Sequence, residues 1–391
     1  MLPLLAAAFV VFPILKHFRA PMMIAAVINK YGQASSVFEY RDDVPKPKIS
    51  QPNEILIKNY RASVNPADCK QRSGNLQLVV KHKFPLILSQ DFAGVIVEVG
   101  SNVSKKFQVG DEVFGTTAPR NGCAAEFVVA FESELAHKPK NITWDQAAAA
   151  PTGFCTAWRG LFDSNYGNLA LPDPFTDSAP NDVDCSKENV LILGASGSVG
   201  SSAVQLASKL SQANVYGICG ERNIDYVESI GAVKAYCYES DFVSALQNVK
   251  FDLILDCVGG DSYYYSCYSL LGDRRHGRSN EKALYVTCVG PVLHGGSKKI
   301  TYGTIFSTIK VLVPRMLNDA IFGSSRYKMY LSFTTENGIL ANVAKALEKE
   351  LITPRIDPLS PLPLRKINEA HEKVERGTSD GKLILKVVEH E

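Results

Sequence analysis

The spacing of apolar residues divides the chain into two parts that predict different architectures. In the first part, short apolar segments such as 54–64 and 92–99 are separated by Gly, Pro and Asn, a pattern typical of β-strands joined by turns. In the second part, apolar strands at 189–193, 214–219 and 251–259 alternate with helical segments. Strands that alternate with helices predict right-handed crossovers and a parallel sheet covered on both faces.

The pattern changes near Thr143, which is expected to cap a helix that begins at Trp144. The segment 163–188 is rich in Asp, Pro, Asn and Ser, which predicts an excursion on the surface. An amphipathic helix at 366–377 and a last strand at 382–388 close the chain. We therefore predict an α/β protein in which a β-rich domain is interrupted by a doubly wound parallel sheet and completed by the C-terminal residues.

Composition excludes several functional classes. The chain has 391 residues, of which 46% are hydrophobic and 21% are charged, as in a globular protein rather than a disordered or polytopic membrane protein. Its net charge of +2 creates no strong field, so no nucleic-acid partner is expected. The nine cysteines include no C-x-x-C pair, which indicates free thiols in a reducing, intracellular compartment.

The N-terminal extension, residues 1–21, is the one compositional anomaly. Residues 2–15 are apolar and uncharged, and the positive charges follow them. This run is shorter than the ~20 residues of a spanning helix, and a secretory signal carries its positive charge before the apolar run. Three interpretations stay open: a membrane or organelle anchor through residues 1–19, a poorly ordered extension, or a true start at Met22 or Met23.

The sharpest local signal is a glycine turn between the strand at 189–193 and the following helix. Glycines let the backbone approach a pyrophosphate, and a helix N-terminus offers free N–H groups to its phosphates. The G-x-x-G-x-x-G spacing matches the generic dinucleotide fingerprint only in part, so the flanking strand and helix favour a cofactor site over a structural turn. The candidate cofactor-binding residues are Gly194, Ala195, Ser196, Gly197, Ser198, Val199 and Gly200.

The end of the next strand indicates which dinucleotide is bound. An acidic residue at this point would hold the ribose hydroxyls of NADH, but the strand ends at Cys219 and Gly220 without one. Arg222 follows, and an arginine would pair with the 2′-phosphate of NADPH. Glu221 lies one residue past the expected position of the acid and keeps NADH as the alternative. We expect NADPH, with Arg222 as a binding residue.

Several further motifs complete a pattern that resembles a known family. They occur in order with the glycine turn at residues 64–68, 90–100, 109–115, 147–158, 255–260 and 381–387. Together they are similar to the zinc-independent quinone-oxidoreductase branch of the medium-chain dehydrogenase/reductases. The resemblance implies a GroES-like catalytic domain, a Rossmann domain, an NADPH cofactor between them and a homodimer. The expected domains are the extension 1–21, a catalytic domain 22–155, a Rossmann domain 156–339 and a C-terminal return 340–391.

The resemblance also assigns roles to individual residues and a location to the protein. Tyr238 matches a tyrosine that borders the adenosine phosphate, and Gly259 and Gly290 match turns that line the nicotinamide. Thr156 is assigned to the same cofactor. Asn65 matches an asparagine beside the nicotinamide ring and is the candidate catalytic residue, with the capping of a turn as its alternative role. A mitochondrial or organelle-membrane location is expected, with the cytosol as the alternative.

Neither zinc site of the related alcohol dehydrogenases is expected. Those enzymes carry Cys at the position of Asn65 and a His-Glu pair at Gln90 and Asp91, and amide side chains are poor zinc ligands. Only Cys123 lies where a four-cysteine lobe would bind structural zinc. Asp68 and Asp91 are expected to brace the domain rather than to form a catalytic pair of carboxylates.

Two functions from different classes follow. The first is an NADPH-dependent reductase of quinones or α,β-unsaturated carbonyl compounds, because conjugate addition of hydride needs no Lewis acid. The second is a cofactor-binding but weakly catalytic protein of interaction or organelle assembly, because the tyrosine that many relatives carry after Gly74 is missing. The segment 291–328 is expected to shape the substrate mouth or a subunit contact, and its apolar run 305–312 is equally compatible with ordinary core.

Overall fold

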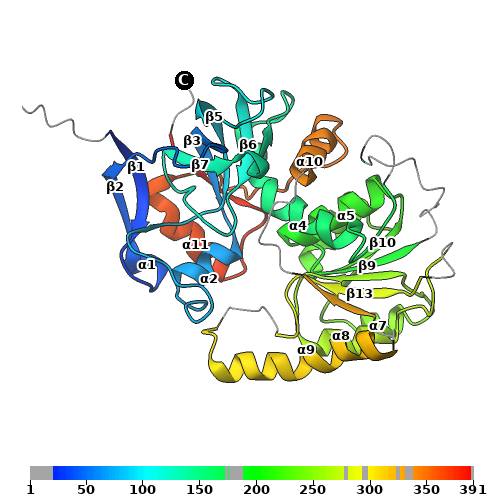
Figure 1. The fold of residues 1–391 in the computed structure, drawn as a ribbon. Coiled ribbons are helices and arrows are strands. Elements are labelled where there is room, and N and C mark those ends of the chain that lie inside the picture. The colour runs from blue at the N-terminus through cyan, green and yellow to red at the C-terminus, as the bar shows by residue number, and fades with distance from the viewer. Residues whose placement is uncertain are drawn as a thin grey trace, which may run out of the picture.

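The structure is a computed structural model, and it describes residues 21–171, 175, 188–276, 281–292, 298–322, 326–330 and 338–388. Residues 1–19, for which a membrane anchor is one of three interpretations, lie outside the described residues, as does Cys185. A β-rich part, blue to cyan, lies beside an α/β part, green to orange (Figure 1). Within these described parts, no helix combines the length and the apolarity that crossing a membrane requires.

The β-rich part contains two sheets that are largely antiparallel. The smaller has the order β2 (Phe38–Pro45), β1 (Met22–Ile28), β4 (Leu86–Ile87). The larger has the order β15 (Leu362–Pro363), β16 (Leu383–Lys386), β3 (Glu54–Val64), β5 (Asp91–Val99), β6 (Glu112–Thr116), β8 (Leu135–His137), and β7 (Phe127–Phe131) also pairs with β3. Because β5, β7 and β16 all pair with it, β3 is buried along almost its whole length.

The helices are short except for three. The α-helices are α1 (Ala34–Val37), α2 (Pro66–Arg72), α3 (Trp144–Ala149), α4 (Pro151–Phe162), α5 (Ser198–Lys209), α6 (Ile224–Ser229), α7 (Phe242–Ala245), α8 (Asp261–Tyr268), α9 (Tyr302–Phe322), α10 (Ile339–Glu348) and α11 (Ile367–Glu375). The 3₁₀ turns are η1 (Glu132–Glu134), η3 (Glu221–Asn223) and η4 (Leu364–Lys366). The predicted cap of α3 is confirmed, since Gln146 N donates to Thr143 Oγ1 at 3.2 Å.

The second part is a six-stranded sheet in which every strand runs parallel. Its order is β11 (Lys234–Cys237), β10 (Asn214–Cys219), β9 (Asn189–Leu193), β12 (Leu253–Asp256), β13 (Leu284–Thr287), β14 (Tyr327–Met329). Along β9, Val190 and Ile192 pack in the cluster that contains α4 and α5, whereas Leu191 and Leu193 pack with α7 and α8. The sheet is therefore buried on both faces, and the predicted doubly wound architecture is confirmed.

The C-terminal residues return to the first sheet after the parallel sheet is complete. β16 runs antiparallel to β3, with Leu385 opposite Ala62. α4 packs both on β6 and on α5, so the hydrophobic core continues from one part into the other. The expected domains 22–155, 156–339 and 340–391 therefore remain a proposal. Residue 155 lies inside α4, and the core continues across it without a break.

Two expectations from the sequence are wrong in detail. The described ends of the segment 163–188 do not all lie on the surface, because Leu169 and Phe175 are buried in the core beside α4. The run 305–312 is not ordinary core either, because it lies in α9 and exposes Phe306 and Ile309 to solvent. Both errors concern which face of a segment is covered, and that depends on residues distant in sequence.

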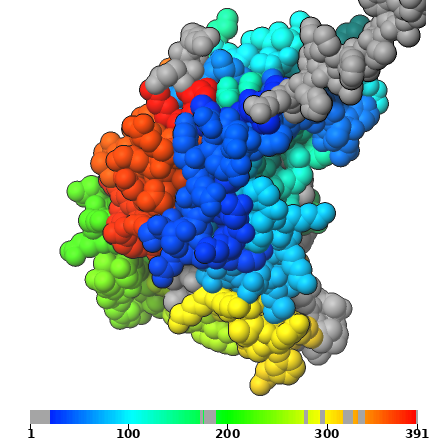
Figure 2. Space-filling view, turned by 90° about the vertical axis from the view of Figure 1, so that its left-hand side faces the viewer, coloured from blue at the N-terminus to red at the C-terminus, as the bar shows by residue number. Residues whose placement is uncertain are grey.

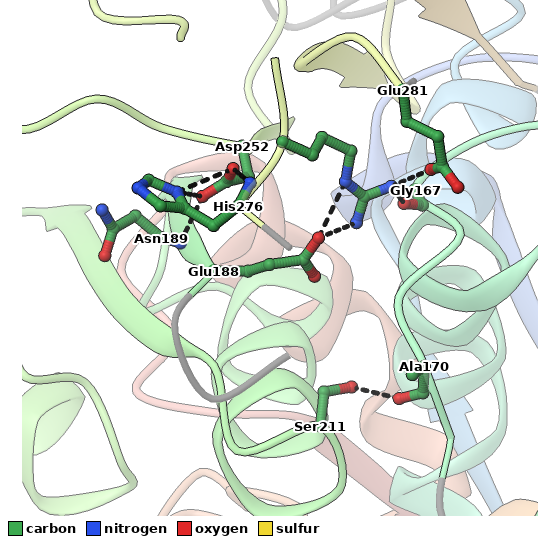
Figure 3. Close-up of polar contacts among 9 residues, drawn as sticks. Gly167, Ala170, Glu188, Asn189, Ser211, Asp252, His276 and Glu281 are labelled. Atoms are coloured by element: carbon green, nitrogen blue, oxygen red, sulfur yellow. Dashed lines mark hydrogen bonds and ion pairs between the residues drawn. The ribbon is translucent and has the colours of Figure 1, made fainter. Parts of the chain in front are cut away.

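A buried ion pair fixes the edge of the parallel sheet at which β9 begins. Arg275 donates through Nε to Glu188 Oε1 at 2.9 Å and through Nη1 to Gly167 O at 2.7 Å, and both charged side chains are almost fully buried (Figure 3). Beside it, Asp252 accepts from Asn189 N at 2.7 Å. The Arg275 guanidinium thus holds both Gly167 and Glu188, near the two ends of the segment 163–188, against the sheet.

We expect Arg275→Met to lower the free energy of unfolding by about 3–5 kcal/mol, because the change leaves the Glu188 carboxylate buried without its cation. Chemical denaturation monitored by circular dichroism measures this change. Arg376→Met is the matched control, since its ion pair with Glu372 is exposed and should contribute less than about 1 kcal/mol. Equal denaturation midpoints for the two variants would contradict the structural role of Arg275.

Candidate functional site

The glycine turn lies at the carboxyl end of β9, where the chain enters α5. Gly194 N and Ala195 N both donate to Ile218 O at 2.9 Å, which ties the turn to β10. The first intrahelical bond of α5 runs from Ser201 N to Gly197 O at 2.8 Å. The N–H groups of the first turn have no acceptor within the helix and carry its positive dipole end. This arrangement suits an anion such as a phosphate.

The three glycines of the turn differ in what the fold requires of them. Gly194 has a φ of +78°, which a residue with a side chain rarely adopts. At Gly200 a Cβ atom would clash with the carbonyl oxygen of Gly194, so this glycine permits the close approach of α5. At Gly197 φ is −71°, and a Cβ atom would meet nothing nearer than the Gly194 oxygen at 3.4 Å. The protein itself therefore leaves room for a side chain at Gly197.

Two further turns stand at the same edge of the sheet. After β12, Gly259 N donates to Asp256 Oδ1 at 2.8 Å, and after β13, Gly290 N donates to Thr287 Oγ1 at 3.1 Å. Asp256 and Thr287 are opposite each other in the register of the two strands. Gly260 N donates to Gly290 O at 3.0 Å and joins the two turns. Both Gly259 and Gly290 have positive φ, at +82° and +90°, as tight turns of this kind require.

Arg222 and Tyr238 lie at the carboxyl ends of the next two strands. Arg222 and Glu221 are both exposed in η3, directly after β10. Tyr238 N donates to Cys219 O at 2.9 Å, and the Tyr238 ring lies 3.5 Å from the position of a Cβ atom on Gly220. Because parallel strands end at one edge, the structure brings these residues into line with the glycine turn.

Thr156 stands apart from the other predicted cofactor residues, because it lies on α4 rather than on the sheet. It is buried, and its carbonyl oxygen accepts from the Tyr330 hydroxyl at 2.8 Å. One turn earlier in α4, a Cβ atom on Gly153 would lie 2.7 Å from Ser198 Oγ, so the helix approaches the glycine turn at its N-terminal end. Thr156 therefore lies in the core on α4, one turn beyond the residue that approaches the glycine turn.

A small cavity separates the glycine turn from the C-terminal segment. Its volume is about 20 Å³, enough for one water molecule, so a phosphate placed here would widen the gap. Ser196 and Ser198 of the turn line one side, and the cationic side chains of Arg355 and Lys382 line the other. Neither cation is among the site residues predicted from the sequence. Lys382 lies in the motif at 381–387, which served only as a mark of the family.

Arg355 is held beside the predicted adenosine end of the site. Its Nη1 donates to Asn223 Oδ1 at 3.1 Å, one residue from Arg222. The guanidinium also forms an ion pair with Asp380 and lies 3.8 Å from the centroid of the Tyr226 ring. These contacts fix Arg355 in place next to the turn η3.

Lys382 is buried between Asn65 and Asp91. Its Nζ donates to Asn65 Oδ1 and lies 3.1 Å from Asp91 Oδ2. The Asn65 amide in turn donates through Nδ2 to Asp91 Oδ2 at 3.0 Å. Both ends of the Asn65 amide are therefore engaged, and Lys382 determines its orientation.

Asp91 joins four segments of the chain at this point. Besides Asn65 and Lys382, it accepts from Ser63 Oγ in β3 at 2.8 Å and from Thr152 Oγ1 in α4 at 2.5 Å. A buried carboxylate needs such compensation because desolvation of an isolated charge is costly. These bonds agree with the expectation that Asp91 braces the domain.

Asp68 is a second buried carboxylate, and it is connected to Lys382 through Asn65. Its Oδ2 accepts from Asn65 N at 2.7 Å and thereby fixes the start of α2. Burial raises the pKa of Asp68 to about 7, and the negative charge of Asp91 acts in the same direction. Asp68 is therefore expected to hold its proton below neutral pH.

The thiols and the possible metal ligands take no visible part in this site. In the portion of the chain that the structure describes, no three His, Cys, Asp or Glu side chains are grouped so that they could hold a metal ion. The eight described cysteines are free, as predicted from the sequence. Burial raises the pKa of the Cys69 and Cys123 thiols, which makes them poor nucleophiles.

A β-rich domain beside a parallel sheet, with a glycine turn between the first strand of that sheet and its helix, defines a nicotinamide-dependent oxidoreductase of the medium-chain dehydrogenase/reductase architecture. Comparison with family models gives the same class. The alcohol dehydrogenase GroES-like domain matches residues 51–140, and the zinc-binding dehydrogenase domain matches residues 230–385.

Individual relatives narrow the class. The chain is 34% identical over 385 residues to human mitochondrial NAD(P)H oxidoreductase RTN4IP1, covering 95% of this chain and 90% of that protein. It is 36% identical over 244 residues to the chloroplast envelope quinone oxidoreductase homolog of Arabidopsis thaliana, covering 61% of this chain and 69% of the relative. The quinone oxidoreductase from Coxiella burnetii is 26% identical with a TM-score of 0.69, covering 94% of this chain and all of that one. This chain belongs to the quinone-oxidoreductase-type NAD(P)H oxidoreductases of the medium-chain dehydrogenase/reductase family.

The pKa of Asp68 predicts a specific dependence of stability on pH. Because this pKa is higher in the folded chain than in the unfolded chain, the folded state binds the extra proton between about pH 4 and pH 7. Stability should therefore fall as pH rises through this window, by at most about 1.4 kcal/mol per pH unit. Asp68→Asn should flatten that part of the profile, measured by urea denaturation from pH 4 to pH 8. An unchanged slope in the variant would show that Asp68 is ionised throughout.

Proposed function

We propose that the protein is an NADPH-dependent reductase that transfers hydride to a quinone or an α,β-unsaturated carbonyl compound without zinc. The glycine turn carries the proposal, because the N-terminus of α5 offers free N–H groups and the Cβ position of Gly197 is open, so a phosphate could approach the backbone once the small cavity beside the turn widens. Two relatives described as quinone oxidoreductases support a quinone as the acceptor class.

The residues at the sheet edge fit an extended dinucleotide. The glycine turn would bind the pyrophosphate, and Arg222 would bind the 2′-phosphate beside the Tyr238 ring. Lys382 adds positive charge on the opposite side of the turn. Gly259 and Gly290 keep the ends of β12 and β13 free of side chains, where the nicotinamide would lie.

The proposed chemistry relies on hydrogen-bond donors rather than on a Lewis acid. A bound reduced nicotinamide supplies the hydride. As the hydride adds, negative charge develops on the acceptor oxygen, and a proton from water completes the reduction. Asn65, oriented by Lys382, would position the nicotinamide or the acceptor. The amides of Asn65 and Gln90 are poor zinc ligands, which supports a reaction without zinc.

We also propose a mitochondrial location and a homodimer. The human relative is described as mitochondrial, which favours the mitochondrion over the cytosol. The partners proposed are a small-molecule acceptor and a second copy of the chain, with no nucleic acid, in line with the nearly neutral net charge of +2.

Gly197→Val separates a phosphate-binding turn from a purely structural one. The backbone at Gly197 suits valine and the protein leaves space for it, so we expect the variant to fold with an unchanged melting temperature. The side chain would stand where the pyrophosphate is proposed to bind, so NADPH binding and quinone reduction should be abolished. Calorimetric titration and a quinone reduction assay in the presence of a chelator measure both effects.

Gly303→Val serves as the matched control, because this glycine also lacks a positive φ and a Cβ atom there would meet only Thr301 Oγ1 at 3.6 Å. The control should bind NADPH normally. If Gly197→Val folds and still reduces quinones at the original rate, the turn does not bind phosphate. If binding is lost while a cellular role persists, the protein acts in assembly rather than as a reductase.

Arg222→Ala tests the choice between NADPH and NADH. The unmodified protein should bind NADPH more tightly, and the substitution should narrow the difference by about 1–3 kcal/mol, the scale of a charge-assisted hydrogen bond. Dissociation constants for both dinucleotides measure this effect, with Arg376→Ala as a control on another exposed arginine. Equal binding of NADPH and NADH by the unmodified protein would overturn the preference.

A further inference from the structure

The helix α9 lies along the outside of the parallel sheet, and its N-terminal end extends below the β-rich part (Figure 1). Its inner face contacts the α/β part through half-buried side chains. Leu312 packs against the sheet, and Arg315 stacks 3.9 Å from the centroid of the Tyr264 ring and pairs with Asp261 at 2.9 Å. The outer face of α9 is thus not needed to hold the helix in place.

That outer face carries a continuous apolar stripe. Tyr302, Phe306, Ile309 and Val313 follow each other at intervals of four, three and four residues, which places them on one line of the helix. They are 79%, 71%, 50% and 43% exposed. Isolated exposed apolar residues are ordinary, but a row of four large ones on a single helix face indicates a surface that is covered in use.

A second segment extends this surface. Residues 75–84 lie against the start of α9, where Ile300 N donates to Asn75 O at 2.8 Å, and the two segments together line a cavity of about 610 Å³. The space-filling view shows the light-blue segment resting directly on yellow α9 (Figure 2). Val79 and Phe84 are exposed here as well.

The charged residues within the two segments all have the same sign. Lys81, Lys83, Lys298, Lys299 and Lys310 are exposed on the two segments. Residues 75–90 and 298–315 contain no Asp or Glu. In a chain with nearly equal numbers of acidic and basic residues, 40 and 42, this is a local separation of charge.

We propose that the outer face of α9, together with residues 79–84, binds the surface of a bilayer that contains anionic lipids. An amphipathic helix with aromatic and aliphatic residues on one face and lysines beside it lies in the interface, with its apolar side chains among the acyl chains. The lysine ammonium groups reach the headgroups and are attracted by their negative charge.

A second copy of the chain is the less suitable occupant. In a two-fold contact the same patch meets itself, so the lysines of one subunit would face those of the other. No acid within the two segments is present to compensate them. An anionic lipid surface satisfies both the apolar stripe and the excess of positive charge.

The test uses the full chain and its co-sedimentation with vesicles. We expect binding to vesicles of phosphatidylcholine mixed with phosphatidylglycerol, and weak binding to phosphatidylcholine alone. The double variant Phe306→Glu, Ile309→Glu should lower the partition coefficient at least about tenfold, because the large apolar side chains no longer enter the membrane. Val109→Glu, Val233→Glu is the control, with two comparably exposed valines outside this surface and the same change in charge.

A second variant tests the electrostatic contribution. Lys298→Gln and Lys299→Gln should each weaken binding to the anionic vesicles about fivefold, and added salt should reduce that difference. Because every variant keeps residues 1–19, any binding through that segment is common to all. Melting temperatures and NADPH binding establish that each variant is folded.

Four results would overturn the proposal. The first three are no vesicle binding by the unmodified chain, equal vesicle binding by the Phe306/Ile309 variant, and an equal loss of vesicle binding in the valine control. The fourth is a change of the Phe306/Ile309 variant from dimer to monomer with vesicle binding retained. The last result, measured by light scattering, would assign α9 to a subunit interface. NADPH binding should be unaffected by the Phe306/Ile309 variant, because the proposed phosphate turn lies on α5, so failure of this proposal leaves the proposed cofactor site untouched.

Discussion

The buried carboxylate of Asp91 is the constraint on which the relation between the two parts of the molecule depends. It lies where β3, the start of α2, the start of α4 and the residue before β16 meet. A charge without solvent is tolerated only when other groups neutralise and hydrogen-bond it. Lys382 provides the positive charge, and it can do so only because the C-terminal segment returns to the first sheet after the parallel sheet has been formed.

The same lysine connects stability with the proposed function. On one side Lys382 orients the Asn65 amide, and on the other it lines the cavity that faces Ser196 and Ser198. A single side chain thus links the β-rich part to the turn that would carry the phosphates. A network of hydrogen bonds around Asp91 holds this region together.

The glycine turn shows how one short motif combines separate physical demands. Gly194 supplies a backbone conformation and Gly200 supplies close packing, so both are required by the fold itself. Neither requirement applies to Gly197, because its φ is negative and its Cβ position is open. Gly197 is the N-cap residue of α5, a position where glycine is common, and the proposed phosphate would be a second reason for the absence of a side chain there.

The sequence determined the features that depend on neighbouring residues. The apolar strands, the cap at Thr143 and the passage from strand through glycine turn to helix are local, and the parallel order of strands placed Arg222, Tyr238, Gly259 and Gly290 at one edge. The motifs in order, which resemble one family, extended this to the two-domain architecture. Local propensity and spacing were sufficient for the strands, the cap and the glycine turn because these features depend on residues close together in the chain, whereas the two-domain architecture was predicted from the family resemblance.

The tertiary structure alone decided which side chains meet across long separations. Lys382 and Asn65 are 317 residues apart, and no pattern in either segment shows that they form a pair. The same limit applied to α9, because helical periodicity shows that Phe306 and Ile309 share a face but not whether that face is covered. Burial is a property of the whole packed chain, and so the buried network at Asp91 and the exposed face of α9 became visible only when distant segments were placed together.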